Sequence, residues 1–184
     1  MEDTNPTVYP LAKLVYIENI KFGLRVIIDD FVFIVAKLPV YLGDFTHIAS
    51  YTSITGGGVF SLGDYSTLSS GVRILTGTED IDTPGLLGSA IPEGYRKPLR
   101  SEVHIGRHCM VGANSVVLPG AMIPDGVVIG AMSLVRENSK LSPWSIWAGN
   151  PLRHFRDRPR DKILAMTEAL EREVDRGTRW RIED

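Results

Sequence analysis

An aliphatic residue recurs at every sixth position in the second half of this chain. The series from residue 105 to residue 141 has no gap: Ile105, Val111, Val117, Ile123, Ile129, Val135 and Leu141. A period of six matches neither the 3.6-residue period of a helix nor the simple alternation of a strand. It fits a short strand that points residues i and i+4 inward and then turns, so that three strands complete one coil of roughly 18 residues. The repeat therefore predicts a parallel β-helix with a continuous aliphatic core.

The same repeat continues upstream, with small or β-branched residues at the second inward position of each strand. The upstream aliphatic positions are Ile28, Ile34, Leu42, Ile48, Ile54, Leu62, Leu68 and Ile74. The second inward positions are Thr46, Thr52, Ser66, Cys109, Ser115, Val127 and Ser133. We therefore expect one mainly β domain of about five coils over residues 22–158, preceded by a cap or an imperfect first coil over residues 1–21.

Residues 77–102 break the repeat completely. This stretch reads GTEDIDTPGLLGSAIPEGYRKPLRSE and has no aliphatic residues at the required steps. A segment that cannot contribute to the coil core must leave it, and long loops in compact domains are usually functional. The break predicts an excursion loop at a functional site. Beyond residue 159 the spacing of Ile163, Met166, Leu170 and Val174 changes to that of a helix, so residues 159–184 should form a helix and a charged tail.

Composition excludes several classes of protein. The net charge of −2 gives no basic bias toward nucleic acid, and no apolar run is long enough for a membrane span. The N-terminus lacks a signal-peptide pattern and the single cysteine cannot form an internal disulfide, so we expect a cytoplasmic protein. Cys109 falls on an inward position, which favours a small core residue over a nucleophile.

Two longer motifs resemble a known family. The run IGRHCMVGANSVVLPGAMIPDGVVIGAMSLVRENSKLSPWSIWAGNP, and the closing stretch SPWSIWAGNPLRHFRDR, are similar to the left-handed β-helix acyltransferases of the hexapeptide-repeat family. The resemblance covers about residues 40–158. The loop TGTEDIDTPG followed by VHIGRH resembles members that acetylate sugars of surface polysaccharides.

The resemblance implies a homotrimer that uses acetyl-CoA, with active sites between adjacent subunits. On the family pattern, Ala113 and Ala131 match turn positions whose backbone holds the pantetheine arm. Arg136 matches a position that flanks the cofactor. Arg153 and Arg156 match basic positions that meet the nucleotide phosphates, a contact that suits guanidinium groups.

The chain departs from the family at a catalytic position. Many relatives place a histidine after the Thr-Gly that precedes the loop, where it acts as general base on a hydroxyl, and Thr78 stands there in this chain. A hydroxyl nucleophile needs such a base because its pKa is far above 7. A neutral amine is already nucleophilic and depends less on a base. We therefore expect transfer to the amine of a nucleotide-linked amino sugar, with Thr78, Glu79, Asp80 and Asp82 binding the acceptor. Transfer to a sugar or small-molecule hydroxyl stays open as the alternative.

The histidines offer one candidate base and one distant alternative. His47 should point outward on a strand three coils from Ala131, about 14 Å away along the stack, which is within reach of a pantetheine arm. It is the catalytic candidate for a hydroxyl acceptor. The pair His104 and His108 resembles part of the zinc site of related β-helices, the zinc-dependent γ-type carbonic anhydrases, but such a site needs three histidines. The AGNP motif and the basic run favour CoA, so we expect no metal. A non-catalytic β-helix scaffold is the remaining alternative.

Overall fold

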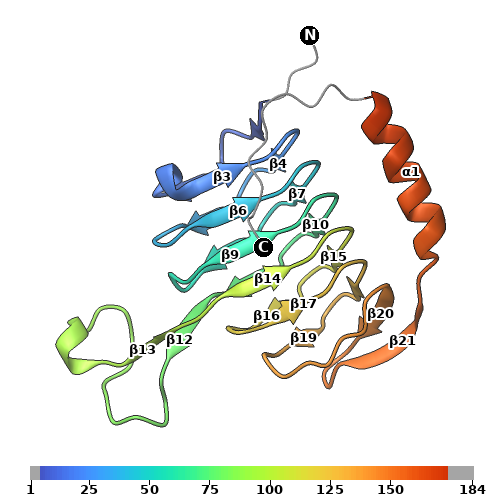
Figure 1. The fold of residues 1–184 in the computed structure, drawn as a ribbon. Helices are drawn as coiled ribbons and strands as arrows, with labels where there is room; N and C mark the ends of the chain where they lie inside the picture. Colours follow the sequence, from blue (N-terminus) through green and yellow to red (C-terminus); the bar gives the residue numbers. More distant parts are fainter. Residues whose placement is uncertain (1–4, 174–184) are drawn as a thin grey trace.

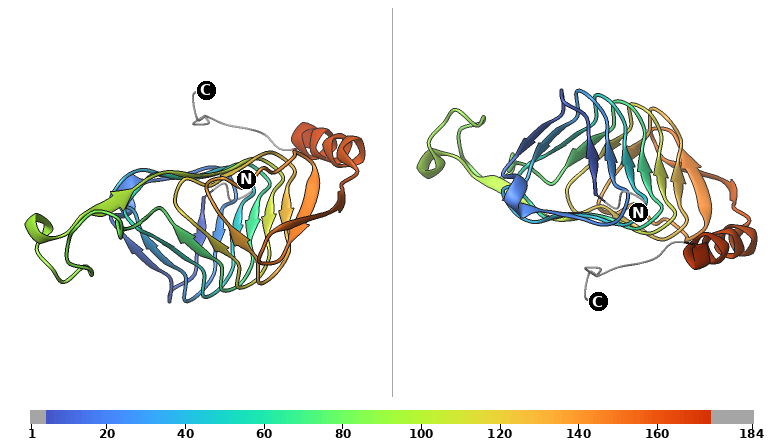
Figure 2. Two further views of the ribbon diagram at one scale, coloured as in Figure 1. Left: turned by 90° about the horizontal axis from the view of Figure 1, so that it is seen from below. Right: turned by 90° about the horizontal axis from the view of Figure 1, so that it is seen from above.

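The six-residue repeat folds into three sheets that form the sides of a left-handed parallel β-helix (Figures 1 and 2). The structure is a computed structural model and describes residues 5–173. Consecutive strands of the coils pass from one sheet to the next, so each coil strand pairs in parallel with the strand one coil away. The predicted β-helix is confirmed.

The eight-stranded sheet, here called sheet A, has seven parallel strands and one antiparallel strand at its C-terminal edge. In spatial order its strands are β1 (Thr7–Val8), β4 (Ile27–Ile28), β7 (His47–Ile48), β10 (Thr67–Leu68), β15 (Met110–Val111), β18 (Val128–Ile129), β20 (Ser145–Ala148) and β21 (Arg153–Asp157).

The other two sheets are parallel throughout. Sheet B consists of β2 (Lys13–Val15), β5 (Phe33–Val35), β8 (Ser53–Thr55), β11 (Arg73–Leu75), β16 (Val116–Val117) and β19 (Leu134–Val135). Sheet C consists of β3 (Ile20–Phe22), β6 (Val40–Leu42), β9 (Phe60–Leu62), β14 (Val103–Ile105) and β17 (Met122–Ile123). A short 3₁₀ helix, η1 (Ile17–Asn19), precedes β3.

The stack is longer than the predicted five coils. Sheet A alone has seven parallel strands, and the first complete coil already begins at Thr7. This coil uses Val8, Leu14 and Ile20, which are also six residues apart. It lies within the segment that the sequence assigned to a cap or an imperfect first coil. Val8 is 38% exposed because a terminal coil is covered on one side only, so its aliphatic pattern is less complete.

The inward positions form the core as expected. The aliphatic positions of the repeat from Ile28 to Val135 are at most 1% exposed. The second inward positions are also buried, and their hydroxyls donate to nearby carbonyls: Thr46 to Gly43 O (2.9 Å), Ser66 to Gly106 O (2.8 Å) and Ser133 to Gly130 O (2.7 Å). Because a buried hydroxyl is costly without a partner, these bonds explain why small polar residues are tolerated in the core.

One corner of the prism carries a ladder of rings beneath the C-terminal helix. At the corner between sheets C and A, Phe45, Tyr65, His108 and Trp144 occupy left-handed turn positions. Neighbouring rings lie 5.0 to 5.5 Å apart between centroids. The helix α1 (Arg160–Glu173) runs back along this side (Figure 1), and the Tyr65 hydroxyl donates to Glu171 (2.8 Å). The predicted helix is therefore present, while Val174 and the tail lie outside the described residues.

The predicted loop leaves the β-helix at the corner between sheets B and C. Its two ends pair as an antiparallel ribbon of β12 (Gly77–Glu79) and β13 (Pro98–Arg100), with the 3₁₀ helix η2 (Glu93–Tyr95) between them. Figures 1 and 2 show this ribbon projecting away from the coils.

Candidate active site

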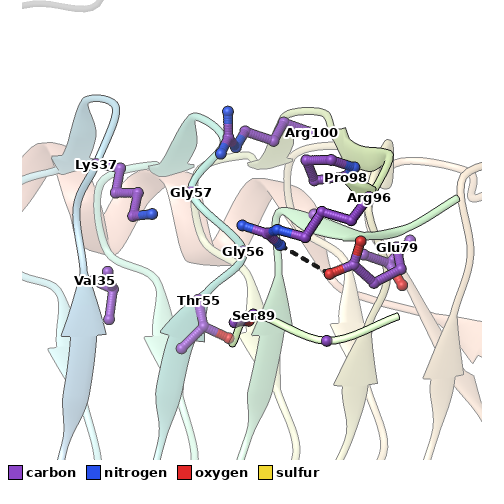
Figure 3. A pocket seen from close by; sticks show the side chains of 13 residues that line it. Val35, Lys37, Thr55, Gly56, Gly57, Glu79, Ser89, Arg96, Pro98 and Arg100 are labelled. Atoms are coloured by element: carbon purple, nitrogen blue, oxygen red, sulfur yellow. Dashed lines mark hydrogen bonds and ion pairs between the residues drawn. The ribbon is translucent and has the colours of Figure 1, made fainter. Parts of the chain in front are cut away.

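A pocket of about 410 Å³ lies at the root of the excursion loop. The ends of β5 and β8, the Gly56–Gly57 turn and both strands of the ribbon line it (Figure 3). Its volume falls within the usual range for small-molecule sites. The folding back of β13 onto β12 encloses this space beside the coil corner.

A charged pair dominates the pocket. Arg96 Nη1 lies 2.9 Å from Glu79 Oε1, and the two side chains are 11% and 20% exposed. Within the described residues, the second carboxylate oxygen, Glu79 Oε2, and the Arg96 Nε atom are buried without a hydrogen-bond partner. Buried polar atoms normally find partners. Both atoms are therefore unsatisfied, and a polar ligand would pair with them only after the Glu79–Arg96 pair shifts to expose them.

The structure separates the four loop residues predicted to bind the acceptor. Thr78 and Glu79 line the pocket, whereas Asp80 and Asp82 do not. Asp80 instead accepts bonds from the backbone of Asp82 (3.0 Å) and Thr83 (3.1 Å), which shapes the turn. A hydrogen bond from the Thr83 side chain, followed by these backbone bonds, lowers the pKa of the Asp80 carboxyl.

Sequence reasoning missed three cationic side chains of the same pocket, Lys37, Arg96 and Arg100. Lys37 comes from the coil preceding the Gly56–Gly57 turn, and the two arginines come from the far end of the loop. Arg96 and Arg100 come 59 and 63 positions after Lys37, and nothing in the repeat connects the three residues. Only the antiparallel pairing of Thr78 with Leu99 brings them together, and no local pattern signals that register.

The two alanines predicted to hold the pantetheine arm form one column. The Met132 N–H donates to Ala113 O (2.9 Å), and the Asn114 N–H donates to Ser70 O (3.0 Å), which places Ala131 and Ala113 in register at the corner between sheets A and B. Ala131 is exposed and Ala113 is half-buried. Their small side chains leave the backbone accessible along this corner.

The three predicted arginines are placed differently relative to this column. Arg153 is exposed on β21 and pairs with Ala148 of β20. The Cβ of Ala148 lies 2.9 Å from the position that a Cβ built on Gly130 would take. It therefore lies beside the C-terminal end of the column. Arg156 pairs with Ile146, farther back on the same ribbon. Arg136 follows β19 and so lies at the corner between sheets B and C, away from Ala131.

His47 lies near the N-terminal end of the same column. It points outward from β7 and pairs in register with Thr67, which pairs with Met110, which pairs with Val128, as the six-residue repeat predicts. Its Nε2 atom lies 3.1 Å from Asp29 Oδ1, and the two side chains are 40% and 28% exposed. A carboxylate in this place orients the ring, and the sequence pattern alone does not point to Asp29.

The pocket and the alanine column belong to different corners of one chain. The strands of sheet B run from the column at their start to the loop root at their end. Within a single chain, the width of this sheet separates Glu79 from Ala131 and from His47.

The other histidines do not converge. His104 Nδ1 lies 2.5 Å from the Ser61 hydroxyl on sheet C, and His154 Nε2 lies 3.0 Å from Asp157 Oδ1. His108 is buried in the ring ladder, and burial together with the nearby Arg107 lowers its pKa. Within residues 5–173, no group of three or more His, Cys, Asp or Glu side chains is arranged to hold a metal ion.

Cys109 provides a direct test of the core packing. Burial raises the pKa of its thiol to about 12, so the group stays protonated at neutral pH. Because the thiolate is the reactive form, we expect iodoacetamide at pH 8 to leave the native protein unmodified and to alkylate it after unfolding. Mass spectrometry measures both states. Rapid alkylation of the native protein would contradict the placement of Cys109 in the core.

Comparisons with known proteins agree on one group of enzymes. The family model "Bacterial transferase hexapeptide (six repeats)" matches residues 102–137. The chain is 33% identical over 150 residues to a dTDP-4-amino-4,6-dideoxy-D-glucose acyltransferase of Escherichia coli, covering 81% of this chain and 77% of the relative. It is 36% identical over 100 residues to WbbJ of Escherichia coli K12, a putative lipopolysaccharide biosynthesis O-acetyl transferase, covering 53% of this chain and 47% of that one.

A solved structure shares most of this fold. It is a single-residue variant of AntD, an N-acyltransferase from Bacillus cereus, in complex with dTDP-4-amino-4,6-dideoxyglucose and coenzyme A. The TM-score is 0.81 at 30% identity, and the match covers 91% of this chain and 88% of that one. In the part of the chain that the structure describes, no helix has the length and apolar character needed to cross a membrane.

Proposed function

Because this chain belongs to the hexapeptide-repeat acyltransferases, we propose that it transfers the acetyl group of acetyl-CoA to the amine of a nucleotide-linked amino sugar used in surface-polysaccharide synthesis. An amino-sugar acyltransferase matches four fifths of the chain, and AntD, which is similar over nine tenths, has been solved with a dTDP-linked amino sugar.

The observation that carries this proposal is the Glu79 carboxylate in the loop pocket. One oxygen pairs with Arg96 and the other, Oε2, is buried without a partner among the described residues. A donor on the acceptor, an amine N–H or a hydroxyl O–H, would supply the missing hydrogen bond, whereas an ether oxygen would not. Thr78, which lines the pocket, stands where the family resemblance places the histidine that acts on hydroxyl acceptors, and the absence of that histidine favours an amine over a hydroxyl acceptor.

The reaction follows from this arrangement. The acceptor amine, held by Glu79, attacks the thioester carbonyl directly, without a covalent enzyme intermediate. A backbone amide stabilises the oxyanion of the tetrahedral intermediate. The C–S bond then breaks, the amide is formed, and the proton lost from nitrogen reaches the departing thiolate, so that the products are the N-acetylated sugar and CoA.

The corner between sheets A and B supports the binding of acetyl-CoA as the second substrate. Ala113 and Ala131 leave backbone groups open to a pantetheine arm, and Arg153 lies at the end of the column where phosphates would be met. Arg136 and Arg156 are assigned to the cofactor by resemblance only.

A thiol-release assay tests the function. Acetyl-CoA is combined with dTDP-4-amino-4,6-dideoxyglucose, with other nucleotide-linked amino sugars, and with the matching sugars that carry a hydroxyl in place of the amine. We expect CoA release with the amine series and little with the hydroxyl series. Release with the hydroxyl series alone would reject N-transfer, and release with neither would reject the proposal.

Arg153→Ala is expected to raise the KM for acetyl-CoA about tenfold with a smaller change in kcat. The side chain is exposed beside the column and its loss removes a charge-assisted phosphate contact that acts in ground state and transition state alike. Steady-state kinetics at saturating acceptor measure the effect, and Arg172→Gln on α1 is the control. An unchanged KM would remove Arg153 from the cofactor site.

Transfer to a hydroxyl is the second candidate, and the His47–Asp29 pair favours it. A histidine oriented by a carboxylate at 3.1 Å is a suitable general base, and it lies on sheet A, whose strands lead into the corner of the alanine column. WbbJ, which is similar over half of this chain, is named as an O-acetyl transferase.

His47→Ala separates the two candidates. If His47 is the base for a hydroxyl acceptor, we expect kcat to fall at least about 100-fold, the usual size of a general-base effect. If the acceptor is an amine, we expect turnover within a few-fold of the unaltered enzyme. The measurement is kcat with whichever acceptor the thiol-release assay identifies.

The separation of the two corners supports a homotrimer with active sites between subunits. The acceptor pocket of one chain can act on acetyl-CoA held by the alanine column of its neighbour, although the two are apart within one chain. Sedimentation equilibrium tests the oligomeric state, and a monomer with full activity would contradict the arrangement.

A further inference from the structure

We propose that Lys37 and Arg100, together with Arg96, form the subsite that binds the diphosphate of the nucleotide-linked acceptor. This inference rests on the proposed function, because it assigns one part of the same substrate. The pocket then recognises both ends of the acceptor's sugar: the amine at Glu79 and the diphosphate at the three cations.

The first observation is that the side chains of Lys37 and Arg100 lie on either side of Gly57. Gly57 has a φ of +76°, and a Cβ built on it would lie 3.3 Å from Lys37 Cδ and 3.6 Å from Arg100 Nε. The two side chains therefore flank one point above the Gly57 backbone. Figure 3 shows the cationic ends of Lys37, Arg100 and Arg96 turned toward the Gly56–Gly57 turn.

The second observation is that the charges of these cations are only partly neutralised by neighbouring carboxylates. Lys37 forms no ion pair with any of residues 5–173. The partner of Arg100 is Glu93 at 3.2 Å, a carboxylate that is itself 71% exposed. Arg96 is paired with Glu79, yet its buried Nε atom has no partner among the described residues. Three cations and one carboxylate line the pocket, so its charge is positive.

The chemistry of these groups points to phosphate. A guanidinium binds two phosphate oxygens in parallel, and an ammonium serves as a compact charge beside it. Each phosphate of a diphosphate ester carries a negative charge, so two neighbouring phosphates match cations on both sides of Gly57. An uncharged free sugar would leave these cations unused, so the subsite selects nucleotide-linked acceptors.

Acetyl-CoA also has a diphosphate, so the experiment must separate the two sources. Isothermal titration calorimetry measures the binding of dTDP and of thymidine, which lacks phosphates, to the unaltered protein and to Lys37→Met, Arg100→Gln and the double variant. We expect each single change to weaken dTDP binding about tenfold and the double change about 100-fold, on the size of charged hydrogen bonds, with thymidine binding unchanged. Lys162→Met and Arg172→Gln, exposed on α1, are matched controls.

Several results would overturn the subsite. The unaltered protein could bind dTDP no better than thymidine, or the double variant could bind dTDP normally. The variants could instead raise the KM for acetyl-CoA and leave that for the acceptor unchanged, which would assign the cations to CoA. Since Lys37 is exposed, its replacement should leave the thermal unfolding temperature unchanged, which calorimetry checks.

The result is distinguishable from a failure of the proposed function. If acetyl transfer to dTDP-4-amino-4,6-dideoxyglucose is absent while the variants lose dTDP binding, the function is wrong and the subsite stands. If transfer occurs and the variants keep the acceptor KM, the function stands and the subsite is wrong.

Discussion

Replacing Glu79 with glutamine is expected to lower kcat/KM for the amino-sugar acceptor about 100-fold, equivalent to about 2.7 kcal/mol of transition-state stabilisation. The substitution keeps the size of the side chain but removes the charge that holds the amine and pairs with Arg96 at 2.9 Å. Hydrogen bonds to charged groups have this strength when water is excluded. Initial rates of CoA release at varied acceptor concentration measure the loss.

Two comparisons make this result specific. Glu102→Gln removes an exposed carboxylate at the end of the same loop, away from the pocket, and should leave the kinetics unchanged. The KM for acetyl-CoA should also stay unchanged in Glu79→Gln, because the cofactor column lies at another corner. A Glu79→Gln enzyme with normal acceptor kinetics would show that the amine is held elsewhere.

Mixing two strongly impaired variants is expected to restore activity. Ala131→Trp places a large ring on the exposed corner that is assigned to the pantetheine arm, and Glu79→Gln disables the acceptor pocket. If each active site takes its column from one subunit and its pocket from the next, random trimers of the two variants contain some sites with both halves intact, about a quarter of the total. The thiol-release rate of the co-refolded mixture measures this recovery.

The control is the double variant Ala131→Trp/Glu79→Gln mixed with either single variant. With Ala131→Trp that mixture contains no intact column, and with Glu79→Gln it contains no intact pocket, so neither mixture should recover activity. If the two single variants stay as inactive together as they are apart, each chain must hold its own complete site.

The prediction of the fold succeeded because the repeat is a local property repeated many times. Each coil needs an aliphatic residue at one position and a small residue four positions later, and Ile105, Val111 and Val117 satisfy that rule without reference to distant contacts. The prediction was wrong only at the terminal coil, where one side has no neighbouring coil and burial therefore constrains the residues least. There Val8 is partly exposed and the stack was counted as shorter than it is.

The prediction of the site was less complete, for the opposite reason. Ala113 and Ala131 are 18 residues apart, which is one coil of the repeat and predicts that they stack, and the backbone bonds of the corner confirm this. The break in the repeat correctly located the loop. It could not tell which loop residues face the pocket, and of the four acidic and polar candidates only Thr78 and Glu79 do so.

The sequence by itself determined the β-helix, the column of alanines and the place where the chain leaves the coil. These follow from a period that every coil repeats, since stacking fixes the register once the period is known. The tertiary structure decided the pocket: Arg96 and Arg100 return beside Glu79 and Lys37 because β13 pairs with β12 in one antiparallel register. That pairing closes a loop across many residues, and its free energy depends on contacts between distant segments that no local pattern encodes.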